Sequence, residues 1–326
     1  MSLERQPDRA DQFGDHADQS GSEQRRIPRT LTPLTGVPAI RADDRLQFPL
    51  SNRELEDIVR AALQEDGAFN DVTTLATVVS TRRSRGTLVA RGDGVLAGVP
   101  LAVSAFCILD PKTTIRIEHE DGHRVAKGNP ALFLSGHARP LLSAERVAVN
   151  FMMRLSGIAT LTRKYVDAID GTGVKILDTR KTTPLWRRLE KYAVRCGGGH
   201  NHRMDLASAV LIKDNHLSAV DGSVSEAVRR ARAHAPADAK IEVECDTLDQ
   251  VKAALDVGVD MILLDNMPLA TMREAVALAK GNAILEASGG IRLENVRSVA
   301  ETGVDWISVG KLTHSAPSLD MALDFD

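Results

Sequence analysis

The sequence has few cysteines, no long apolar run and no excess of positive charge. Cys107, Cys196 and Cys245 are far apart and form no CxxC pair, which argues against a disulfide framework or a cysteine zinc cluster and indicates a reducing compartment. No stretch approaches the roughly 18 apolar residues that span a bilayer, and the first thirty residues lack the apolar core of a secretory signal. We therefore expect a cytoplasmic protein.

The charge of the chain is almost balanced, with 41 Lys and Arg against 44 Asp and Glu. This balance argues against a nucleic-acid binder that works through general electrostatics. One segment departs from it: residues 179–203 carry seven Lys or Arg and two His, but only one acid, Glu190. A local excess of cations predicts either a solvated surface or a bound anion.

Composition and periodicity divide the chain into three parts. Residues 1–45 are polar and predict a disordered extension, because they cannot bury enough apolar surface to offset ordering. Residues 46–150 predict an α+β sandwich domain: a helix capped by Ser51 or Asn52, short strands over 86–135, and a covering helix from Ser143 to about Ile169. Residues 151–326 predict an α/β domain, with a tail that packs back on the first domain.

Six short, almost continuously apolar segments after Gly173 alternate with amphipathic helices. This rhythm predicts parallel strands that are buried on both faces and close into an incomplete TIM-like α/β barrel. Thr247 with Gln250, and Pro268, mark helix starts, whereas Gly258 and Gly303 mark helix ends. The predicted strands span residues 174–178, 209–213, 240–245, 261–265, 283–287 and 305–309.

Polar residues gather where the predicted strands end, which is the working face of such barrels. Any one of them could simply meet solvent, but the set favours a binding site. Arg180 and Lys181, which follow the first strand, can address two carboxylates from different directions. The other polar residues at or near strand ends are Asp178, Lys213, Glu244, Asp265, Ser288 and Ser308.

Two glycine-containing loops follow the last two predicted strands, "ASGGI" and "SVGKLTHS". Glycine lets the backbone approach a ligand closely, and the last loops of a barrel are a recurrent phosphate position. Glu244 and Asp265 could serve sugar hydroxyls or a hydrated Mg²⁺, or could instead be ion-pair partners of Lys213. These features predict an enzyme that binds a phosphorylated sugar and a small polyanion.

Other polar residues of the cationic segment favour simpler readings. Arg187, Arg188 and Lys191 have helical spacing after Pro184 and predict a solvated helix face. The pair His200 and His202 lacks a third His or Cys at a sensible spacing and is weak evidence for zinc. Cys196 lies near cations, but a buried structural cysteine is favoured over a reactive thiol.

Several motifs in register closely resemble the quinolinate phosphoribosyltransferase family, also called nicotinate-nucleotide pyrophosphorylase (carboxylating). They are "EDGAFNDVTT", "LLSAERVAVNFMMRLSGIAT", "DTRKTTP", "GGGHNHRMDL", "LIKDNH", "IEVEC", "LLDNM", "EASGGI" and "GVDWISVGKLTHS". The resemblance runs from about residue 50 to the end. It implies the transfer of phosphoribose from phosphoribosyl pyrophosphate to quinolinate, with Mg²⁺, giving nicotinate mononucleotide, CO₂ and pyrophosphate in de novo NAD biosynthesis. It also implies a homodimer with shared active sites, sometimes assembled further, up to a hexamer.

The resemblance assigns roles to residues of this sequence. Lys213, Glu244 and Asp265 are the implied catalytic residues, and the two carboxylates are implied to hold Mg²⁺ through water; Arg146 is implied to reach into the partner's site. The implied quinolinate ligands are Arg146, Thr179, Arg180, Lys181, His202, Arg203 and Lys213. The implied phosphoribosyl pyrophosphate ligands are Lys213, Glu244, Asp265, Ser288, Gly289, Gly290, Gly310 and His314.

The match has small departures, and other functions stay open. Leu185 stands where the family commonly has a glycine after Pro184, and "FND" replaces the usual "GD". A related branch, found beside molybdenum-transport genes, shares the scaffold with an ill-defined substrate, although intact "DTRKTT" and "NHRMDL" favour quinolinate. A Schiff-base aldolase using Lys213 and a non-catalytic metabolite sensor are the rivals from other classes.

Overall fold

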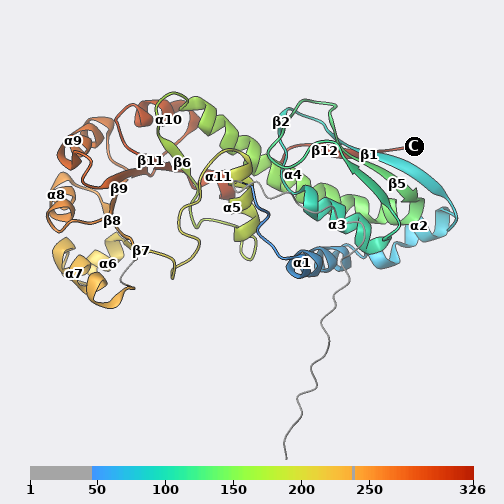
Figure 1. Ribbon diagram of the computed structural model, residues 1–326, viewed down its shortest axis with the longest axis horizontal. Coiled ribbons are helices and arrows are strands. Elements are labelled where there is room, and N and C mark those ends of the chain that lie inside the picture. Colours follow the sequence, from blue (N-terminus) through green and yellow to red (C-terminus); the bar gives the residue numbers. More distant parts are fainter. Residues whose placement is uncertain (1–45, 237–238) are drawn as a thin grey trace, which may run out of the picture. The chain divides into compact units, whose positions relative to one another are not determined.

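The computed structural model describes residues 46–236 and 239–326 (Figure 1). The predicted extension, residues 1–45, lies outside the described residues. Within residues 46–236 and 239–326, no helix combines the length and the apolar character needed to cross a bilayer.

The amino-terminal part is built on a four-stranded antiparallel sheet in the order β12-β1-β5-β3. The edge strand β12 comes from the carboxyl-terminal residues. It pairs with β1 from Gly86 opposite Phe325 to Ala90 opposite Met321. The strands are β1 (Arg83–Ala90), β3 (Thr114–Ile117), β5 (Pro130–His137) and β12 (Met321–Phe325), with a small ribbon of β2 (Gly94–Val95) and β4 (Arg124–Val125).

Helices flank this sheet, and one of them corrects the sequence prediction. Residues 99–109, within the segment predicted as strands, form a helix that begins just after Gly98 and has Pro100 in its first turn. Every residue from Val99 to Phe106 except Pro100 is buried, so the segment is apolar on all sides and its periodicity is hidden. The helices are α1 (Asn52–Glu65), η1 (Ala68–Asn70), α2 (Val72–Thr77), α3 (Val99–Leu109) and α4 (Ala138–Ala168).

The long helix α4 begins five residues before the predicted start at Ser143 and ends one residue before Ile169. Its predicted apolar face is confirmed, because Val147, Phe151 and Leu155 are buried. The helix is continuous across residue 150, so the predicted domain boundary stays a prediction. α4 contacts elements of both parts of the chain, including α3, β2, α5 and β6.

The carboxyl-terminal part confirms the predicted barrel and its incompleteness. Its six strands are all parallel in the order β6-β11-β10-β9-β8-β7, and within the described residues β6 and β7 remain unpaired with each other. The strands are β6 (Lys175–Leu177), β7 (Val210–Ile212), β8 (Ile241–Cys245), β9 (Met261–Asp265), β10 (Ile284–Ser288) and β11 (Trp306–Ser308).

Helices cover the outside of this sheet (Figure 1). The predicted capping box of Thr247 and Gln250 is present at the start of α8, and Gly258 and Gly303 take left-handed backbone just after helices end. The helices are α5 (Arg187–Cys196), α6 (Asp214–Ser218), α7 (Val224–His234), α8 (Leu248–Asp256), α9 (Leu269–Ala279), α10 (Leu293–Ala300) and α11 (Lys311–His314).

A buried ion pair fixes the loops around β6. The Lys191 ammonium donates to the carboxylate of Asp178, and both side chains are fully buried. Lys191 also donates to the carbonyl of His202 (2.9 Å), and Asp178 accepts from the backbone N–H of His202 (2.9 Å) and from Asn201 (2.5 Å). The predicted solvated position of Lys191 is therefore wrong: α5 turns this cation inward because Asp178 is there to meet it.

We expect Lys191→Met to destabilise the protein by about 3–5 kcal/mol, because it leaves the Asp178 carboxylate buried without its cation. Urea denaturation of the two proteins would measure the difference. Lys252→Met is the matched control, since Lys252 forms an exposed pair with Asp249 and such pairs contribute little. Equal stability of Lys191→Met and wild type would contradict the structural role of the pair.

Candidate functional site

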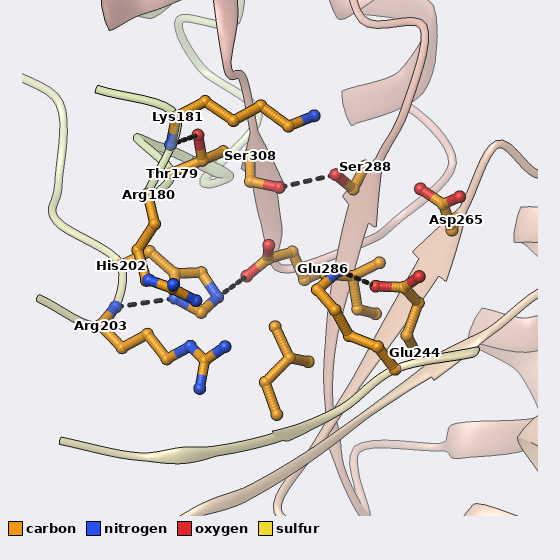
Figure 2. A pocket seen from close by; sticks show the side chains of 13 residues that line it. Thr179, Arg180, Lys181, His202, Arg203, Glu244, Asp265, Glu286, Ser288 and Ser308 are labelled. Carbon is orange, nitrogen blue, oxygen red and sulfur yellow. Dashed lines mark hydrogen bonds and ion pairs between the residues drawn. The ribbon is translucent and has the colours of Figure 1, made fainter. Parts of the chain in front are cut away.

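A cavity of about 320 Å³ opens at the carboxyl ends of the barrel strands. Strand residues two apart point to the same face of a sheet. One strand can therefore place two side chains in the cavity wall, one deeper than the other, as β9 does with Leu263 and Asp265. Figure 2 shows the resulting ring of side chains. The lining residues are Thr179, Arg180, Lys181, His202, Arg203, Leu211, Lys213, Glu244, Leu263, Asp265, Glu286, Ser288 and Ser308.

One side of the cavity is cationic (Figure 2). Arg180 and Lys181 lie in the loop that follows β6, and Arg203 reaches the cavity from the segment after α5. That segment runs beside β6, because the Asp178 N–H donates to the carbonyl of His200 (3.1 Å). Arg180 and Lys181 were predicted to act together with Arg203, which is distant in the sequence. The structure brings all three to the same wall of the cavity.

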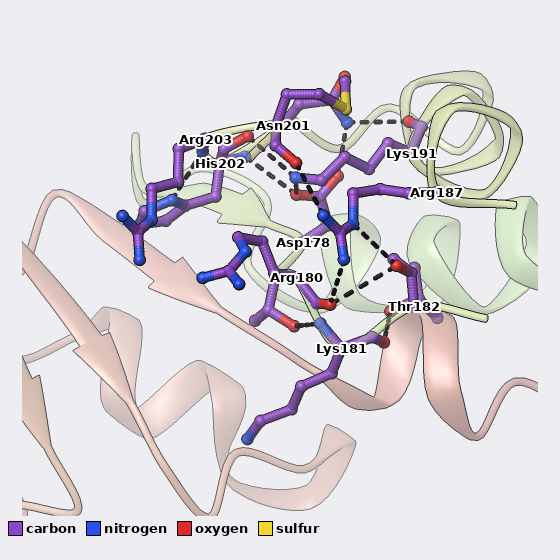
Figure 3. A network of polar contacts seen from close by, with 12 residues as sticks. Asp178, Arg180, Lys181, Thr182, Arg187, Lys191, Asn201, His202 and Arg203 are labelled. Atoms are coloured by element: carbon purple, nitrogen blue, oxygen red, sulfur yellow. Dashed lines mark hydrogen bonds and ion pairs between the residues drawn. The ribbon is translucent and has the colours of Figure 1, made fainter. Parts of the chain in front are cut away.

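The loop that carries Arg180 and Lys181 is held from behind (Figure 3). Arg187 donates to the hydroxyl of Thr182 (3.0 Å) and to the carbonyl of Arg180 (3.4 Å). Arg187 therefore supports the loop rather than lying on the predicted solvated helix face. Arg188 is exposed, as predicted, and pairs with Glu54 of α1 (2.6 Å).

The opposite side of the cavity carries carboxylates and hydroxyls. Lys213, at the end of β7, forms an ion pair with Glu244, whose side chain is 10% exposed. Asp265 is half-buried at the end of β9 and accepts a hydrogen bond from Asn266 (2.7 Å). This arrangement realises the predicted alternative in which Glu244 is an ion-pair partner of Lys213, and it leaves both carboxylates at the cavity surface.

The two glycine loops adjoin this side. The Ser308 hydroxyl donates to that of Ser288 (3.0 Å), which joins the ends of β11 and β10. Gly289 has a φ of 84°, and a Cβ there would lie 2.3 Å from the Asn266 side-chain oxygen, so only glycine fits. A Cβ on Gly310 would lie 3.1 Å from Lys181 and 3.3 Å from His314, which places the second loop beside the cationic wall.

The structure places some predicted ligands outside the cavity wall. Within the described residues, the lining does not include Gly289, Gly290, Gly310 or His314, although their loops flank it. Arg146 is exposed on α4 and likewise does not line the cavity of its own chain.

Two acids that sequence reasoning missed lie below the predicted rim. Glu242 on β8 and Glu286 on β10 are buried, and Glu286 lines the cavity. Each precedes a predicted site residue by two positions, Glu244 and Ser288 respectively, so both point to the same face as that residue. A charged residue inside an otherwise apolar strand was the signal that could have found them.

These acids face His202. Its Nε2 lies 3.1 Å from Oε2 of Glu242 and 3.4 Å from Oε2 of Glu286, while its Nδ1 accepts from the backbone N–H of Arg203 (2.7 Å). Burial opposes a charged imidazole, but the two carboxylates outweigh it and raise the pKa of His202 to about 10.

A metal ion could be held by this same group, since the ligand atoms of His202, Glu242 and Glu286 lie within 4.8 Å of one another. His200, the other half of the sequence pair, is exposed and does not belong to it. Cys196 is buried, and burial raises the pKa of its thiol well above the usual value, which supports the structural reading over a reactive one.

Comparison with known proteins identifies the family. The domains described as quinolinate phosphoribosyl transferase, N-terminal and C-terminal, match residues 71–156 and 158–324. The nicotinate-nucleotide pyrophosphorylase (carboxylating) of Mycobacterium leprae is 46% identical over 276 residues, covering 82% of this chain and 96% of that protein. A Bacillus subtilis protein named probable nicotinate-nucleotide pyrophosphorylase (carboxylating) is 42% identical, covering 84% and 94%.

Solved structures of NadC and of a nicotinate-nucleotide pyrophosphorylase have the same fold as this chain. The crystal structure of NadC from Streptococcus pyogenes superposes with a TM-score of 0.82 at 41% identity, covering 85% of this chain and 98% of that one. Nicotinate-nucleotide pyrophosphorylase from Ehrlichia chaffeensis gives 0.80 at 39% identity, covering 85% and 99%. By sequence and by fold, the chain belongs to the quinolinate phosphoribosyltransferase family.

Proposed function

We propose that the protein is a decarboxylating quinolinate phosphoribosyltransferase, which makes nicotinate mononucleotide, CO₂ and pyrophosphate in de novo NAD biosynthesis. One observation carries the proposal: a cationic wall and a wall of carboxylates and hydroxyls face each other across a single cavity, in a chain of this family. A dianionic pyridine suits the first wall and a phosphorylated pentose suits the second.

Quinolinate would be bound mainly by Arg180, Lys181 and Arg203. Guanidinium groups pair bidentately with carboxylates, and the lysine adds a point charge from another direction. Thr179, His202 and Lys213 also line the cavity and belong to the proposed set, which Arg146 of a second copy would complete. This arrangement would fix the pyridine ring so that its nitrogen faces the sugar.

Phosphoribosyl pyrophosphate would occupy the opposite wall. Its ribose hydroxyls would meet Glu244 and Asp265, and Ser288 with Gly289, Gly290, Gly310 and His314 would surround the 5′-phosphate. Mg²⁺ fits this wall, because Glu244 and Asp265 offer hard oxygen donors at the cavity surface and the ion usually keeps its waters while bridging phosphates. Bound there, it would neutralise charge on the pyrophosphate.

The residues suggest catalysis by positioning and electrostatics. Departure of pyrophosphate leaves positive charge on the ribose, which the carboxylates of Glu244 and Asp265 can stabilise. The cationic wall would hold the ring nitrogen in line for attack. The positive ring nitrogen formed by that attack would then stabilise the electron pair left on the adjacent ring carbon when its carboxylate departs as CO₂, and a proton from water would replace the carboxylate at that carbon.

A homodimer with shared sites is part of the proposal, and further assembly to a hexamer is compatible with it. Arg146 is exposed on α4 and would complete the site of a second copy. Beside it, α2 is bound to α4 by hydrogen bonds from Arg139 to the carbonyls of Val78 (2.7 Å) and Leu75 (3.2 Å). This region exposes large apolar side chains that a second copy would cover: Phe69, Val72, Leu75 and Val79.

The rivals are less well supported. A Schiff-base lysine needs an apolar surround that lowers its pKa, whereas Lys213 is 44% exposed on its side chain and paired with Glu244. A metabolite sensor would not need Glu244 and Asp265 opposite the cationic wall. The three free cysteines suit the reducing cytoplasm, which is the location we propose.

The function is tested by incubating the purified protein with quinolinate labelled in the 2-carboxyl group, phosphoribosyl pyrophosphate and Mg²⁺. We expect labelled CO₂ that depends on both substrates, with nicotinate mononucleotide formed in equal amount. The inactive control is Lys213→Ala. Stable binding of quinolinate without CO₂ release would favour the sensor, and borohydride trapping of a keto-substrate would favour the aldolase.

We expect Arg203→Ala to raise the KM for quinolinate by about 10- to 100-fold, as expected for loss of a charge-assisted bond to a carboxylate. The KM for phosphoribosyl pyrophosphate should change little, because Arg203 lies on the other wall. Steady-state kinetics with each substrate varied in turn measures both values. Arg273→Ala, which removes an exposed arginine of α9, is the control, and wild-type kinetics for Arg203→Ala would refute the role.

Shared sites predict complementation between two inactive variants. Arg146→Ala would damage the site of the partner, whereas Lys213→Ala damages the site of its own chain. In a dimer with one copy of each variant, one of the two sites has both an unmutated Lys213 and an unmutated Arg146. Activity should therefore return when the variants are mixed and subunits exchange. Exchange is verified with two differently tagged copies, and continued inactivity after proven exchange would argue against the role of Arg146.

A further inference from the structure

Two buried carboxylates lie below a cavity that is proposed to take a dianion. The side chains of Glu242 and Glu286 are 4% and 0% exposed. Oε1 of Glu242 and Oε1 of Glu286 are buried without a hydrogen bond within the described structure, and Oε2 of Glu286 has only the 3.4 Å ion-pair contact with His202. A buried charge is costly unless it is paired, and an acid near a dianion weakens binding, so these two acids need an explanation.

The group that both acids meet is the imidazole of His202. Glu242 approaches from β8 and Glu286 from β10, while the backbone N–H of Arg203 approaches the other ring nitrogen. Arg203 bears electrostatically on Glu242, and Arg180 and Asp205 bear in turn on Arg203. Asp178 and Lys191 hold the His202 backbone from behind.

The contacts define one orientation of the ring. Because the Arg203 N–H donates to Nδ1, the ring proton is on Nε2 and points at the two carboxylates. The raised pKa of His202 favours a second ring proton, but a proton on Nδ1 would point at the Arg203 N–H, and the hydrogen-bond geometry decides for Nδ1 as an acceptor.

The ring orientation also bears on Arg203. The Nδ1 of His202 accepts from the same residue whose guanidinium lies in the cavity wall and donates to the carbonyl of Ala209 (3.0 Å). A rotated imidazole would release that N–H and free the backbone between His202 and Arg203. Glu242 and Glu286 thus influence the position of Arg203 through the imidazole of His202.

We propose that Glu242 and Glu286 are positioning residues of the quinolinate site, which clamp His202 in one orientation and thereby hold Arg203 in the cationic wall. The inference rests on the proposed function, because it concerns the binding of that substrate. It assigns to the acids a role in affinity although they do not pair with the ligand.

Two physical effects of removing an acid have opposite signs, which makes the proposal testable. Glu286→Gln removes a negative charge close to a dianion and would, by electrostatics alone, tighten quinolinate binding. Loss of the clamp would weaken binding by misplacing the cations. The proposal requires the second effect to win.

Binding of quinolinate to the full-length protein is measured by calorimetry for Glu286→Gln and Glu242→Gln, together with both KM values. We expect the Kd for quinolinate to rise about tenfold, with the KM for phosphoribosyl pyrophosphate changed less than about twofold. The control is Glu274→Gln, the same change at an exposed position of α9. The two variants are independent, so either one suffices if the other fails to fold.

A double-mutant cycle identifies the route. If the acids act through His202, Glu286→Gln should add almost nothing to the loss caused by His202→Asn. Nitrogen NMR of the imidazole gives a second readout: His202, assigned by its absence in His202→Asn, should be the Nε2–H tautomer in the wild type and a mixture in Glu286→Gln.

Unchanged or tighter quinolinate binding in both variants would overturn the proposal, as would additive losses in the cycle. A uniform rise of both KM values with a lowered Tm would also overturn it, because that is the signature of a general structural role. A wild-type protein that neither binds nor turns over quinolinate would instead refute the proposed function, so the two failures are distinguishable.

Discussion

The ion pair of Lys191 and Asp178 is the contact on which the cationic wall depends. It joins Asp178, just after β6, to Lys191 of α5, and each partner also bonds to the backbone of His202 in the segment before β7. These contacts together hold the segment with Arg180 and Lys181 against the segment with His202 and Arg203, which lie about twenty residues apart in the chain. Because both charges are fully buried, neither can leave without stranding the other, and the two segments are held at a fixed separation.

A second ion pair, between the partly exposed Arg154 and the buried Glu190, ties this wall to the segment from Thr313 to Ala316. Arg154 of α4 donates to Glu190 of α5 (2.6 Å) and to the carbonyls of Thr313 and Ala316. Glu190 in turn accepts from the backbone N–H (3.0 Å) and the hydroxyl (2.8 Å) of Thr183. With the His202 cluster, three acid–base groups hold the segments that carry the cationic wall, so its cations are positioned by structure before a ligand arrives.

The sequence predicted the barrel and its rim well because both depend on local pattern. Each of the six predicted strands is present, and Lys213, Glu244, Asp265 and Ser288 lie at the cavity as their places at strand ends implied. The buried pairings could not be predicted in this way. Lys191 has the spacing of a solvated helix face, and only the contact with Asp178, which depends on how the loop folds back, turns it inward. The helix α3 was missed because an all-apolar segment has no periodicity to read.

Leu185 shows how this network overrides a local preference. The resemblance to the family predicts a glycine after Pro184, and the structure explains why: Leu185 has a φ of 67°, in the left-handed region that an L side chain adopts at a cost of about 1–2 kcal/mol. Its side chain is 98% exposed, so packing does not offset that strain. The turn is imposed by its neighbours instead, because Glu190 holds Thr183 and Trp186 stacks on Phe151 with ring centroids 5.3 Å apart. The departure from glycine therefore changes stability locally, while the loop that presents Arg180 and Lys181 keeps the course set by the buried acids.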